Sequence, residues 1–406
     1  MTSKIKLGVI RETKNPPDKR VPVTPSQVVI LTERFPNVDV HVQPSDIRCY
    51  TDEEYNYLDL NMKENLSDCD ILIGVKEVDP KALIANKTYM FFSHVAKKQP
   101  YNRELLQEII KKKIRLLDYE YLTDLNGQRI VAFGRWAGIV GAYNGLRARG
   151  IRTDNFNLKP AHQCKDMDEM YAGLKKIKLE KKKILVTGGG RVAMGAMETL
   201  SQLNIREVTA EEFLNQEFDE PVLCRIDPEH YVQHKGGMQF DLQHFFKHPE
   251  EYISTFKRFT KVTDIFVACH FWDPKSPNFI TKEDYLDPEF KITVIADVSC
   301  DVDGPIASTV DASTIAEPFF GYNPTTGKAE PPFTNLKNTT VMSVDNLPGE
   351  LPRNASSDFG KNLIDKVYPS LFGNDDSGII ERATITKDGK LTERYAYLQD
   401  YLDGKE

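Results

Sequence analysis

The feature that most constrains the fold of this chain is an apolar segment followed directly by three consecutive glycines. Residues 183–196 read KILVTGGGRVAMGA, which is a strand pattern, a glycine turn and then a helical pattern. Gly188 permits a tight bend, and Gly190 lets the backbone approach a pyrophosphate. Ala193 supplies the third small side chain, where the new helix packs on its strand. The pattern predicts a dinucleotide-binding unit, although similar turns also occur in α/β domains that bind nothing.

The start of the helix predicted over residues 191–203 is the expected site of the pyrophosphate. Unpaired amide N–H groups and the helix dipole favour negative charge there. The expected cofactor contacts are Gly188, Gly189, Gly190, Arg191 and Val192. In such units an acid usually ends the second strand, about twenty residues after the turn. Here residues 207–209 form the predicted second strand, and the next residue is Ala210. A carboxylate would bind the ribose of NAD and repel the phosphate of NADP, so its absence favours NADP and leaves NAD open.

The composition is that of a soluble globular protein of two ordinary domains. The 406 residues are 40% hydrophobic and 28% charged with a formal net charge of -7, and they contain no long basic run, which argues against a nucleic-acid partner. No segment approaches the roughly 18 consecutive apolar residues of a membrane helix, and no signal-peptide pattern is present, so we expect a cytoplasmic protein. The 6 cysteines and 8 histidines lack C-x-x-C and H-E-x-x-H spacings, so no metal is predicted.

Short apolar runs alternate with helical patterns in two stretches of the chain. One stretch covers roughly the first 135 residues, and the other begins at Lys183. This alternation predicts an α/β fold with two Rossmann-like domains, parallel sheets and a cleft between them. We expect residues 1–136 and 341–406 to form the substrate domain and residues 137–340 to form the dinucleotide-binding domain.

Polar residues that directly follow predicted strands are candidates for the chemistry, because ligands of α/β sheets lie beyond the carboxyl ends of the strands. Residues 71–75 lead into Lys76 and Glu77, and residues 89–93 lead into His94. If these strands are parallel neighbours, the amine, the carboxylate and the imidazole converge. A lysine with a lowered pKa and a histidine can then move protons near neutral pH. Taken singly, such a lysine usually faces solvent, and a lone histidine is usually structural.

Other charged residues occupy comparable positions. Arg20 stands in a proline-rich loop before a predicted helix, where a rigid guanidinium would clamp a carboxylate or serve as a plain turn residue. Glu120 closely follows a predicted strand, and Arg129 follows a predicted turn. Asp297 ends another strand, which is a position suited to face a nicotinamide.

A set of short motifs spans nearly the whole chain in a characteristic order. They are Arg20-x-x-x-Thr24-Pro25, Gly74-Val75-Lys76-Glu77, Phe91-Phe92-Ser93-His94-Val95-Ala96-Lys97, Leu117-Asp118-Tyr119-Glu120, Val131-Ala132-Phe133-Gly134, Ala296-Asp297-Val298-Ser299 and Ser343-Val344-Asp345-Asn346-Leu347-Pro348. Together they resemble lysine-forming saccharopine dehydrogenase. They resemble more closely the lysine-oxoglutarate reductase domain of the bifunctional aminoadipic semialdehyde synthase. Alanine dehydrogenase and the nucleotide-binding part of transhydrogenase are wider relatives.

The resemblance implies that the ε-amine of lysine condenses with the ketone of 2-oxoglutarate and that a reduced nicotinamide delivers hydride, giving saccharopine, or the reverse. By the family pattern, Lys76 and His94 are the acid-base pair. Glu77 and Glu120 tune the charge around the lysine. The cations implied to hold substrate carboxylates are Arg20, Arg129 and Lys97. Asp297 is implied to lie near the nicotinamide or the reacting nitrogen.

Two departures from the family pattern leave alternatives open. NAD-specific members place an acid where this chain has Ala210, and no counterpart of the bifunctional protein's second enzyme is expected in the 406 residues. Another amino acid or an opine is therefore an alternative substrate. An alanine-dehydrogenase-like deaminase that uses ammonia is a second reading, and a catalytically silent nucleotide-binding sensor is a third. Lys76 and His94 argue against the sensor. The oligomeric state, including a homo-oligomer, stays open.

Overall fold

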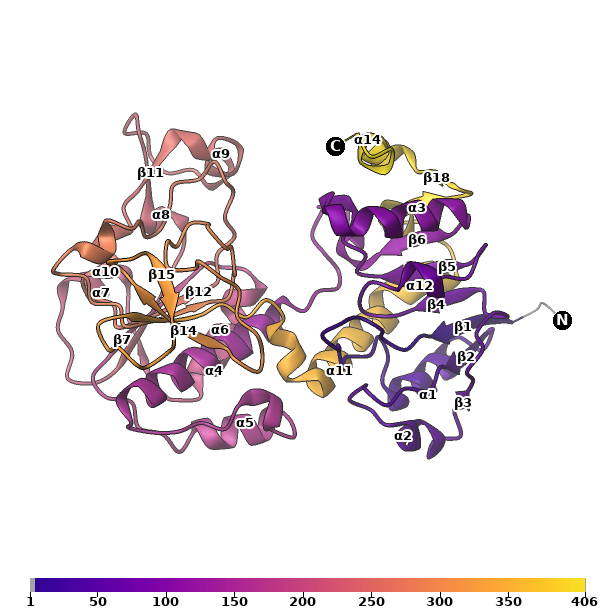
Figure 1. The fold of residues 1–406 in the computed structure, drawn as a ribbon, viewed down its shortest axis with the longest axis horizontal. Helices are drawn as coiled ribbons and strands as arrows, with labels where there is room; N and C mark the ends of the chain where they lie inside the picture. The colour runs from indigo at the N-terminus through magenta and orange to yellow at the C-terminus, as the bar shows by residue number, and fades with distance from the viewer. Residues whose placement is uncertain (1–3, 406) are drawn as a thin grey trace. The chain divides into compact units, whose positions relative to one another are not determined.

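The structure is a computed structural model that describes residues 4–405, and its contacts divide the chain into two units (Figure 1). The first unit comprises Met1–Phe133 and Pro352–Glu406, and the second comprises Gly134–Leu351. The sequence predicted that the second domain ends at residue 340, whereas the second unit ends at Leu351. A boundary at residue 340 would cut the strand β16 (Thr339–Met342), which pairs with strands of the second unit.

The first unit is built on a mostly parallel sheet. Its strands are β1 (Ile5–Val9), β2 (Val38–Val42), β3 (Asn61–Met62), β4 (Ile71–Ile73), β5 (Thr88–Phe91), β6 (Arg115–Asp118), β17 (Thr384–Lys387) and β18 (Lys390–Leu391). They lie in the order β18-β17-β6-β5-β4-β1-β2-β3. The pairs from β6 to β3 are parallel, whereas β17 is antiparallel to both neighbours. The carboxyl ends of β1, β4, β5 and β6 therefore share one edge of the sheet.

Helices and short helical turns connect these strands. The α-helices are α1 (Pro25–Arg34), α2 (Asp52–Asn56), α3 (Arg103–Lys111), α11 (Pro352–Asn362), α12 (Tyr368–Phe372), α13 (Ile379–Ala383) and α14 (Gln399–Leu402). Shorter turns lie at Pro80–Ala82, Val95–Lys97, Pro100–Asn102, Tyr119–Tyr121, Leu363–Val367 and Glu393–Leu398. Helix α1 begins after Thr24, whose side chain accepts from the Gln27 N–H, and Pro25 supplies a first helical residue that needs no donor.

The second unit contains another mostly parallel sheet. Its strands are β7 (Lys183–Thr187), β8 (Arg206–Glu207), β9 (Val222–Ile226), β12 (Ile265–Ala268), β13 (Val294–Asp297), β14 (Phe319–Asn323), β15 (Lys328–Glu330) and β16. Their order is β15-β14-β16-β13-β12-β7-β9-β8. β7 thus lies between β12 and β9, and β8 does not pair with it. Ala210 follows β8, which is the outermost strand on that side of the sheet. The lack of an acid at Ala210 therefore does not show which residue follows β9, the strand that pairs with β7.

Helix packing in the second unit requires two glycines. The helices are α4 (Gly134–Thr153), α5 (Met167–Leu174), α6 (Arg191–Ser201), α7 (Ala210–Asn215), α8 (Pro228–Tyr231), α9 (Leu242–Lys247) and α10 (Lys257–Thr260), and a small hairpin joins β10 (Val232–His234) to β11 (Tyr252–Ser254). Short turns lie at Ala161–Gln163, Pro249–Glu251, Asp284–Leu286 and Leu347–Glu350. A Cβ on Gly138 of α4 would lie 1.8 Å from the Val192 carbonyl oxygen, and one on Gly195 of α6 would lie 2.0 Å from that of Arg135. Only glycine allows α4 and α6 to approach this closely.

Each sheet is buried along its central strands. All residues of β4, β7, β12 and β13 are buried, as expected for parallel strands that are covered on both faces. This confirms the predicted α/β class with two mostly parallel sheets. Among residues 4–405, the structure contains no helix with the length and apolar character needed to cross a bilayer.

Candidate active site

Polar side chains gather where four adjacent strands of the first unit end. β4 and β5 are parallel neighbours, with Ile73 opposite Met90, so the condition for bringing Lys76 close to His94 is met. β1 lies on the other side of β4, and β6 lies on the other side of β5. The strand ends therefore bring several charged groups to one edge of this sheet.

Glu77 binds the imidazole of His94. Glu77 Oε1 lies 2.6 Å from His94 Nδ1, and Oε2 lies 2.9 Å from the Lys14 ammonium. Burial raises the pKa of Glu77, but the hydrogen bond and charge of His94 and the bond from Lys14 outweigh this effect and lower it to about 2. Because an ionised carboxylate only accepts, Nδ1 of His94 donates, and its Nε2 is the nitrogen left for proton exchange.

Lys76 has its backbone held by a carboxylate that sequence reasoning missed. Glu12 accepts the Val75 N–H at 2.6 Å and the Lys76 N–H at 2.9 Å. Burial raises the pKa of Glu12 to about 8, despite these two hydrogen bonds. Glu12 closely follows β1, so the rule that selected the residues after β4 and β5 would have found it there.

The Lys76 ammonium lies in a setting suited to proton transfer. Burial lowers its pKa, and the positive charge of Arg20 lowers it further, while Asp18 opposes this. A half-buried lysine with a lowered pKa releases a proton more readily near neutral pH than a solvated one. The direction of this pKa shift is the one that proton transfer by Lys76 would require.

Arg20 was expected to clamp a ligand carboxylate, but in the structure it binds a carboxylate of its own chain. Its Nε and one terminal nitrogen donate to the two oxygens of Asp18 at 3.0 and 2.6 Å, and both side chains are at most 3% exposed. The guanidinium also lies 4.2 Å from the centre of the Phe133 ring. Burial raises the pKa of Asp18, but Arg20 outweighs it and lowers the pKa overall. The guanidinium of Arg20 is thus oriented by the protein itself.

A second charged group lies beyond β6. Arg129 forms an ion pair with Glu120, and Lys97 Nζ lies 3.6 Å from the other oxygen of Glu120. Asp118, which belongs to the Leu117-Asp118-Tyr119-Glu120 motif, accepts the Ser93 N–H at 3.0 Å and the Glu120 N–H at 2.8 Å, which joins the ends of β5 and β6. The predicted cations Lys97 and Arg129 are thus brought together around one carboxylate.

The glycine turn of the second unit has the shape expected for a dinucleotide. Gly188 has φ +99°, and a Cβ there would lie 2.7 Å from the Cys269 carbonyl oxygen, so glycine is required. A Cβ on Gly190 would meet no atom within 4 Å, so the backbone is open to a ligand there. Arg191 and Val192 begin α6, whose N-terminal amides suit a pyrophosphate. These residues fit the predicted cofactor.

Asp297 does not offer a free carboxylate. It is 0% exposed, and its oxygens accept from Ser299, the Cys300 N–H at 3.1 Å and the Thr309 hydroxyl at 2.6 Å. Burial raises its pKa, although these hydrogen bonds oppose the shift. The loop after β13 encloses the carboxylate, and its proximity to a nicotinamide stays a prediction. Its role in this structure is to hold that loop.

Known proteins resemble this chain in sequence and in fold. Residues 8–140 match the family model of the alanine dehydrogenase/PNT N-terminal domain. The chain is 29% identical to alpha-aminoadipic semialdehyde synthase, mitochondrial, of Mus musculus, over 98% of the chain and 48% of that protein. It is 28% identical to saccharopine dehydrogenase [NAD(+), L-lysine-forming] of Yarrowia lipolytica, over 90% of the chain and 92% of that protein. The chain spans about half the length of the synthases it matches.

Two solved structures share the fold of the chain. An L-alanine dehydrogenase superposes with a TM-score of 0.65 at 14% identity, covering 99% of this chain and 100% of that one. A transhydrogenase from Sinorhizobium meliloti gives 0.61 at 15% identity, covering 95% and 98%. The resemblance to this superfamily is confirmed, and every substrate-site residue predicted in the first unit lies inside the matched domain.

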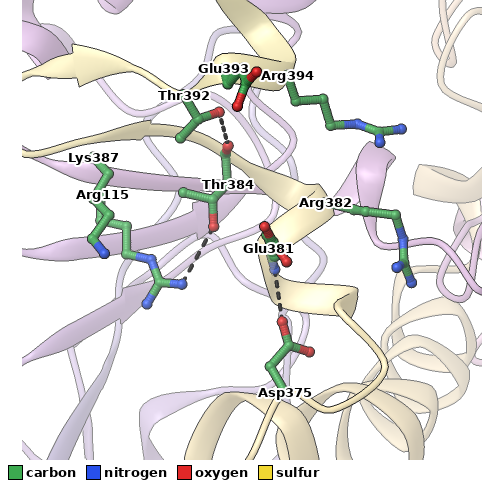
Figure 2. A pocket seen from close by; sticks show the side chains of 9 residues that line it. All are labelled: Arg115, Asp375, Glu381, Arg382, Thr384, Lys387, Thr392, Glu393 and Arg394. Carbon is green, nitrogen blue, oxygen red and sulfur yellow. Dashed lines mark hydrogen bonds between the residues drawn. The ribbon is translucent and has the colours of Figure 1, made fainter.

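A cavity of about 660 Å³ lies elsewhere in the first unit (Figure 2). It is lined in part by Arg115, which begins β6, whereas Asp118 ends β6 at the edge described above. Arg382, also in its lining, donates to the carbonyl oxygens of Ser377 and Thr123 at 2.8 and 2.6 Å. This cavity therefore adjoins the opposite end of β6 from the group of Lys76, Glu77 and His94, and Arg382 donates hydrogen bonds to the protein backbone.

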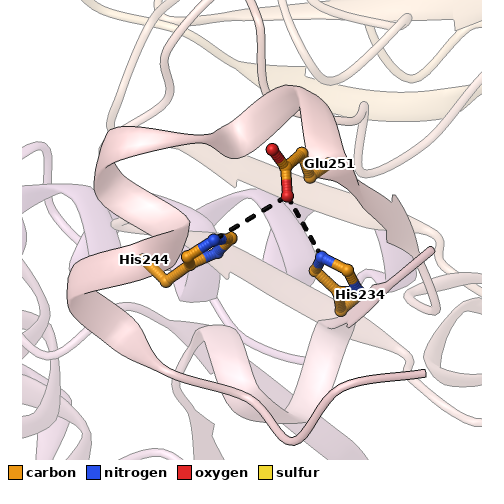
Figure 3. A group of neighbouring side chains, drawn as sticks. All are labelled: His234, His244 and Glu251. Atoms are coloured by element: carbon orange, nitrogen blue, oxygen red, sulfur yellow. Dashed lines mark hydrogen bonds and ion pairs between the residues drawn. The ribbon is translucent and has the colours of Figure 1, made fainter. Parts of the chain in front are cut away.

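Two histidines meet a glutamate beside the small hairpin of the second unit (Figure 3). Glu251 Oε2 lies 3.2 Å from His234 Nε2 and 3.7 Å from His244 Nε2, a grouping that the spacing of the histidines did not predict. The Gly236 N–H donates to His234 Nδ1 at 2.9 Å, so neutral His234 carries its proton on Nε2 and donates to Glu251. A metal ligand needs a lone pair on that nitrogen. The cluster is therefore explained by the hydrogen bond between His234 and Glu251, with His244 close to the same carboxylate oxygen.

Proposed function

We propose that the chain is a nicotinamide-dependent oxidoreductase of the saccharopine dehydrogenase type, which joins the ε-amine of lysine to 2-oxoglutarate or runs the reverse reaction. The observation that carries the proposal is the grouping of Lys76, Glu77 and His94 on an alanine dehydrogenase/PNT N-terminal domain. Homology to saccharopine dehydrogenases over most of the chain supports the substrate class. The first unit would take the substrates, and the second would take the NAD or NADP.

The residues of the first unit supply the proton transfers that this reaction needs. The substrate amine loses a proton as its nitrogen attacks the ketone, and the former ketone oxygen gains protons as it leaves as water. In this proposal, Lys76 and His94 Nε2 take and return these protons, and the Glu77–His94 hydrogen bond through Nδ1 supports the role of the imidazole. The reduced nicotinamide, when bound, supplies the hydride to the imine carbon.

Charge at the same edge suits acidic substrates. Saccharopine carries three carboxylates, and a buried carboxylate costs several kcal/mol unless it is paired. Arg129 and Lys97, now paired with Glu120, would exchange part of that pairing for substrate carboxylates. Arg20, held by Asp18, would contribute its charge to the same site and keep the Lys76 pKa low.

An alanine-dehydrogenase-like deaminase is the second candidate, because the family model and a solved alanine dehydrogenase both match the chain. It would use ammonia in place of the lysine amine. The cation pairs around Glu120 favour the larger acidic substrate. A catalytically silent sensor would not need the shifted pKa of Lys76 or the hydrogen bond to His94.

The deciding experiment follows oxidation of NADH and of NADPH by absorbance. One mixture contains 2-oxoglutarate and lysine, and the other contains pyruvate and ammonia. Cofactor loss only with lysine and 2-oxoglutarate supports the proposal. Loss only with pyruvate and ammonia replaces it with the deaminase. Cofactor binding with no turnover in either mixture leaves the sensor as the better account.

A further inference from the structure

A row of cations on adjacent strands borders the cavity at the start of β6 (Figure 2). Leu116 pairs with Thr386 in antiparallel register, so Arg115 of β6 and Lys387 of β17 stand across from each other. Lys387 in turn lies opposite Lys390 of β18. Like charges that face each other across strands repel. Within residues 4–405 none of these cations forms an ion pair, so positive charge accumulates at this end of the sheet without an anionic partner.

The guanidinium of Arg115 has unused donors. Among the described residues it makes a single hydrogen bond, from a terminal nitrogen to the Thr384 hydroxyl, and this bond is long at 3.4 Å. Its Nε is buried and has no acceptor there. Burial lowers the pKa of Arg115, and the charges of Asp375 and Asp388 oppose this shift, although neither acid forms an ion pair with it. A ligand carboxylate would supply both the acceptors and the charge that this group lacks.

Acidic side chains line another wall of the same cavity. The Glu381 N–H donates to Asp375 at 2.8 Å at the start of α13, and Figure 2 draws these two acids on one side and Arg115 and Lys387 on the other. Asp375 Oδ1 is buried without a donor in the part of the chain that the structure describes. Glu381 and Glu393 are exposed lining residues. We call Arg115 and Lys387 the cationic wall and the three carboxylates the acidic wall.

We propose that this cavity binds a free α-amino acid, with its carboxylate on the cationic wall and its ammonium on the acidic wall. A simple anion would be repelled by the acidic wall and a simple amine by the cationic one, whereas an α-amino acid carries both charges and complements both walls. The volume of about 660 Å³ is within the usual range for small-molecule sites. The amino acid bound here would not be the reacting one, because the cavity adjoins the end of β6 away from Lys76 and His94.

The test follows amide hydrogen exchange of the full chain with each of the common L-amino acids at millimolar concentration. At least one should slow exchange in residues 381–394, and a mixture of acetate and methylammonium at the same concentration should not. Arg115→Met and Asp375→Asn should each raise the dissociation constant of that amino acid, measured from exchange in these residues, at least about tenfold, the loss expected for hydrogen bonds between charged groups. The matched controls are Asp376→Asn, beside Asp375, and Arg34→Met in α1; both residues are exposed, and the constant should not change.

Three results would overturn the inference. One is that no amino acid protects these residues, and another is equal protection by acetate alone, which would indicate a site for simple anions. The third is an unchanged dissociation constant in both variants, which would place the ligand elsewhere. Thermal unfolding without ligand checks that the variants fold, and Asp375→Asn decides the matter if Arg115→Met does not. A chain that oxidises no NADH or NADPH in any substrate mixture would overturn the proposed function and leave this result standing.

Discussion

Buried carboxylates at the edge of the first sheet differ in charge because they differ in partners. Glu12 meets backbone N–H groups, and burial raises its pKa to about 8. For Glu77 burial acts in the same direction, but His94 and Lys14 outweigh it and lower the pKa to about 2. Glu12, whose raised pKa favours the neutral form, thus binds the Lys76 N–H, while Glu77, whose lowered pKa favours the ionised form, is the next residue in the chain. This contrast is typical of sites that move protons.

Replacing Glu12 should flatten the pH dependence of stability. Its folded pKa is raised above the unfolded value, so between about pH 5 and pH 8 the folded state holds a proton that the unfolded state has lost, and stability falls as pH rises. Glu12→Gln should remove a decrease on the order of 3 kcal/mol across that range. The free energy of unfolding in urea at several pH values measures it, and exposed Glu104→Gln should keep the wild-type slope.

Replacing Lys76 should affect turnover much more than cofactor binding. Lys76→Met removes the shifted amine, so kcat for saccharopine formation should fall by about a hundredfold or more. The NADH dissociation constant should stay near normal, because the glycine turn belongs to the second unit. Exposed Lys81→Met is the matched control. Unchanged turnover in both Lys76→Met and His94→Met would contradict the assignment of an acid-base pair.

At the scale of elements, the contact between α4 and α6 supports the glycine turn. A Cβ on Gly195 would lie 2.0 Å from a backbone oxygen of α4, so neither helix can keep its place if a methyl group is added. In the proposed function, the start of α6 would provide the amides for the pyrophosphate. A shift of α6 would therefore change both stability and cofactor affinity.

Gly195→Ala should destabilise the protein by about 1–3 kcal/mol or more, because the added methyl group would clash with backbone atoms, which cannot move aside as a flexible side chain can. NADH affinity should fall as well. Gly173→Ala in α5 is the matched control, since its Cβ would meet nothing within 4 Å, and it should stabilise by roughly 0.5–1 kcal/mol. Thermal unfolding measures both. Equal effects of the two substitutions would show that close approach of α4 and α6 is not what requires Gly195.

At the scale of the whole molecule, the two ligands should protect different units. NADH should slow amide hydrogen exchange at residues 188–192, because the proposed pyrophosphate contacts lie there. Saccharopine should slow exchange at residues 75–77 and 93–97. Hydrogen-exchange mass spectrometry of the full chain measures both. Protection by NADH confined to the first unit would contradict the assignment of the second unit to the cofactor.

Much of the fold and part of the site could be read from local patterns. The alternation of strands and helices predicted two α/β units, and the rule for residues after strands found Lys76, Glu77 and His94 because β4 and β5 are parallel neighbours. The same rule placed Asp297 at the end of a strand, which is correct, but it could not show that the Thr309 hydroxyl and the loop after β13 enclose the carboxylate.

The sequence by itself determined the strand-turn-helix unit at Gly188 and the class of both sheets, because periodicity and glycine geometry act over a few residues. Only the tertiary structure decided that Glu12 binds the N–H of a residue 63 positions away and that β9 takes the place beside β7. Strand order and the pairing of buried charges depend on contacts between distant segments. Asp227, the residue after β9, packs against Gly189 of the glycine turn, and this contact follows from the strand order and not from any local pattern.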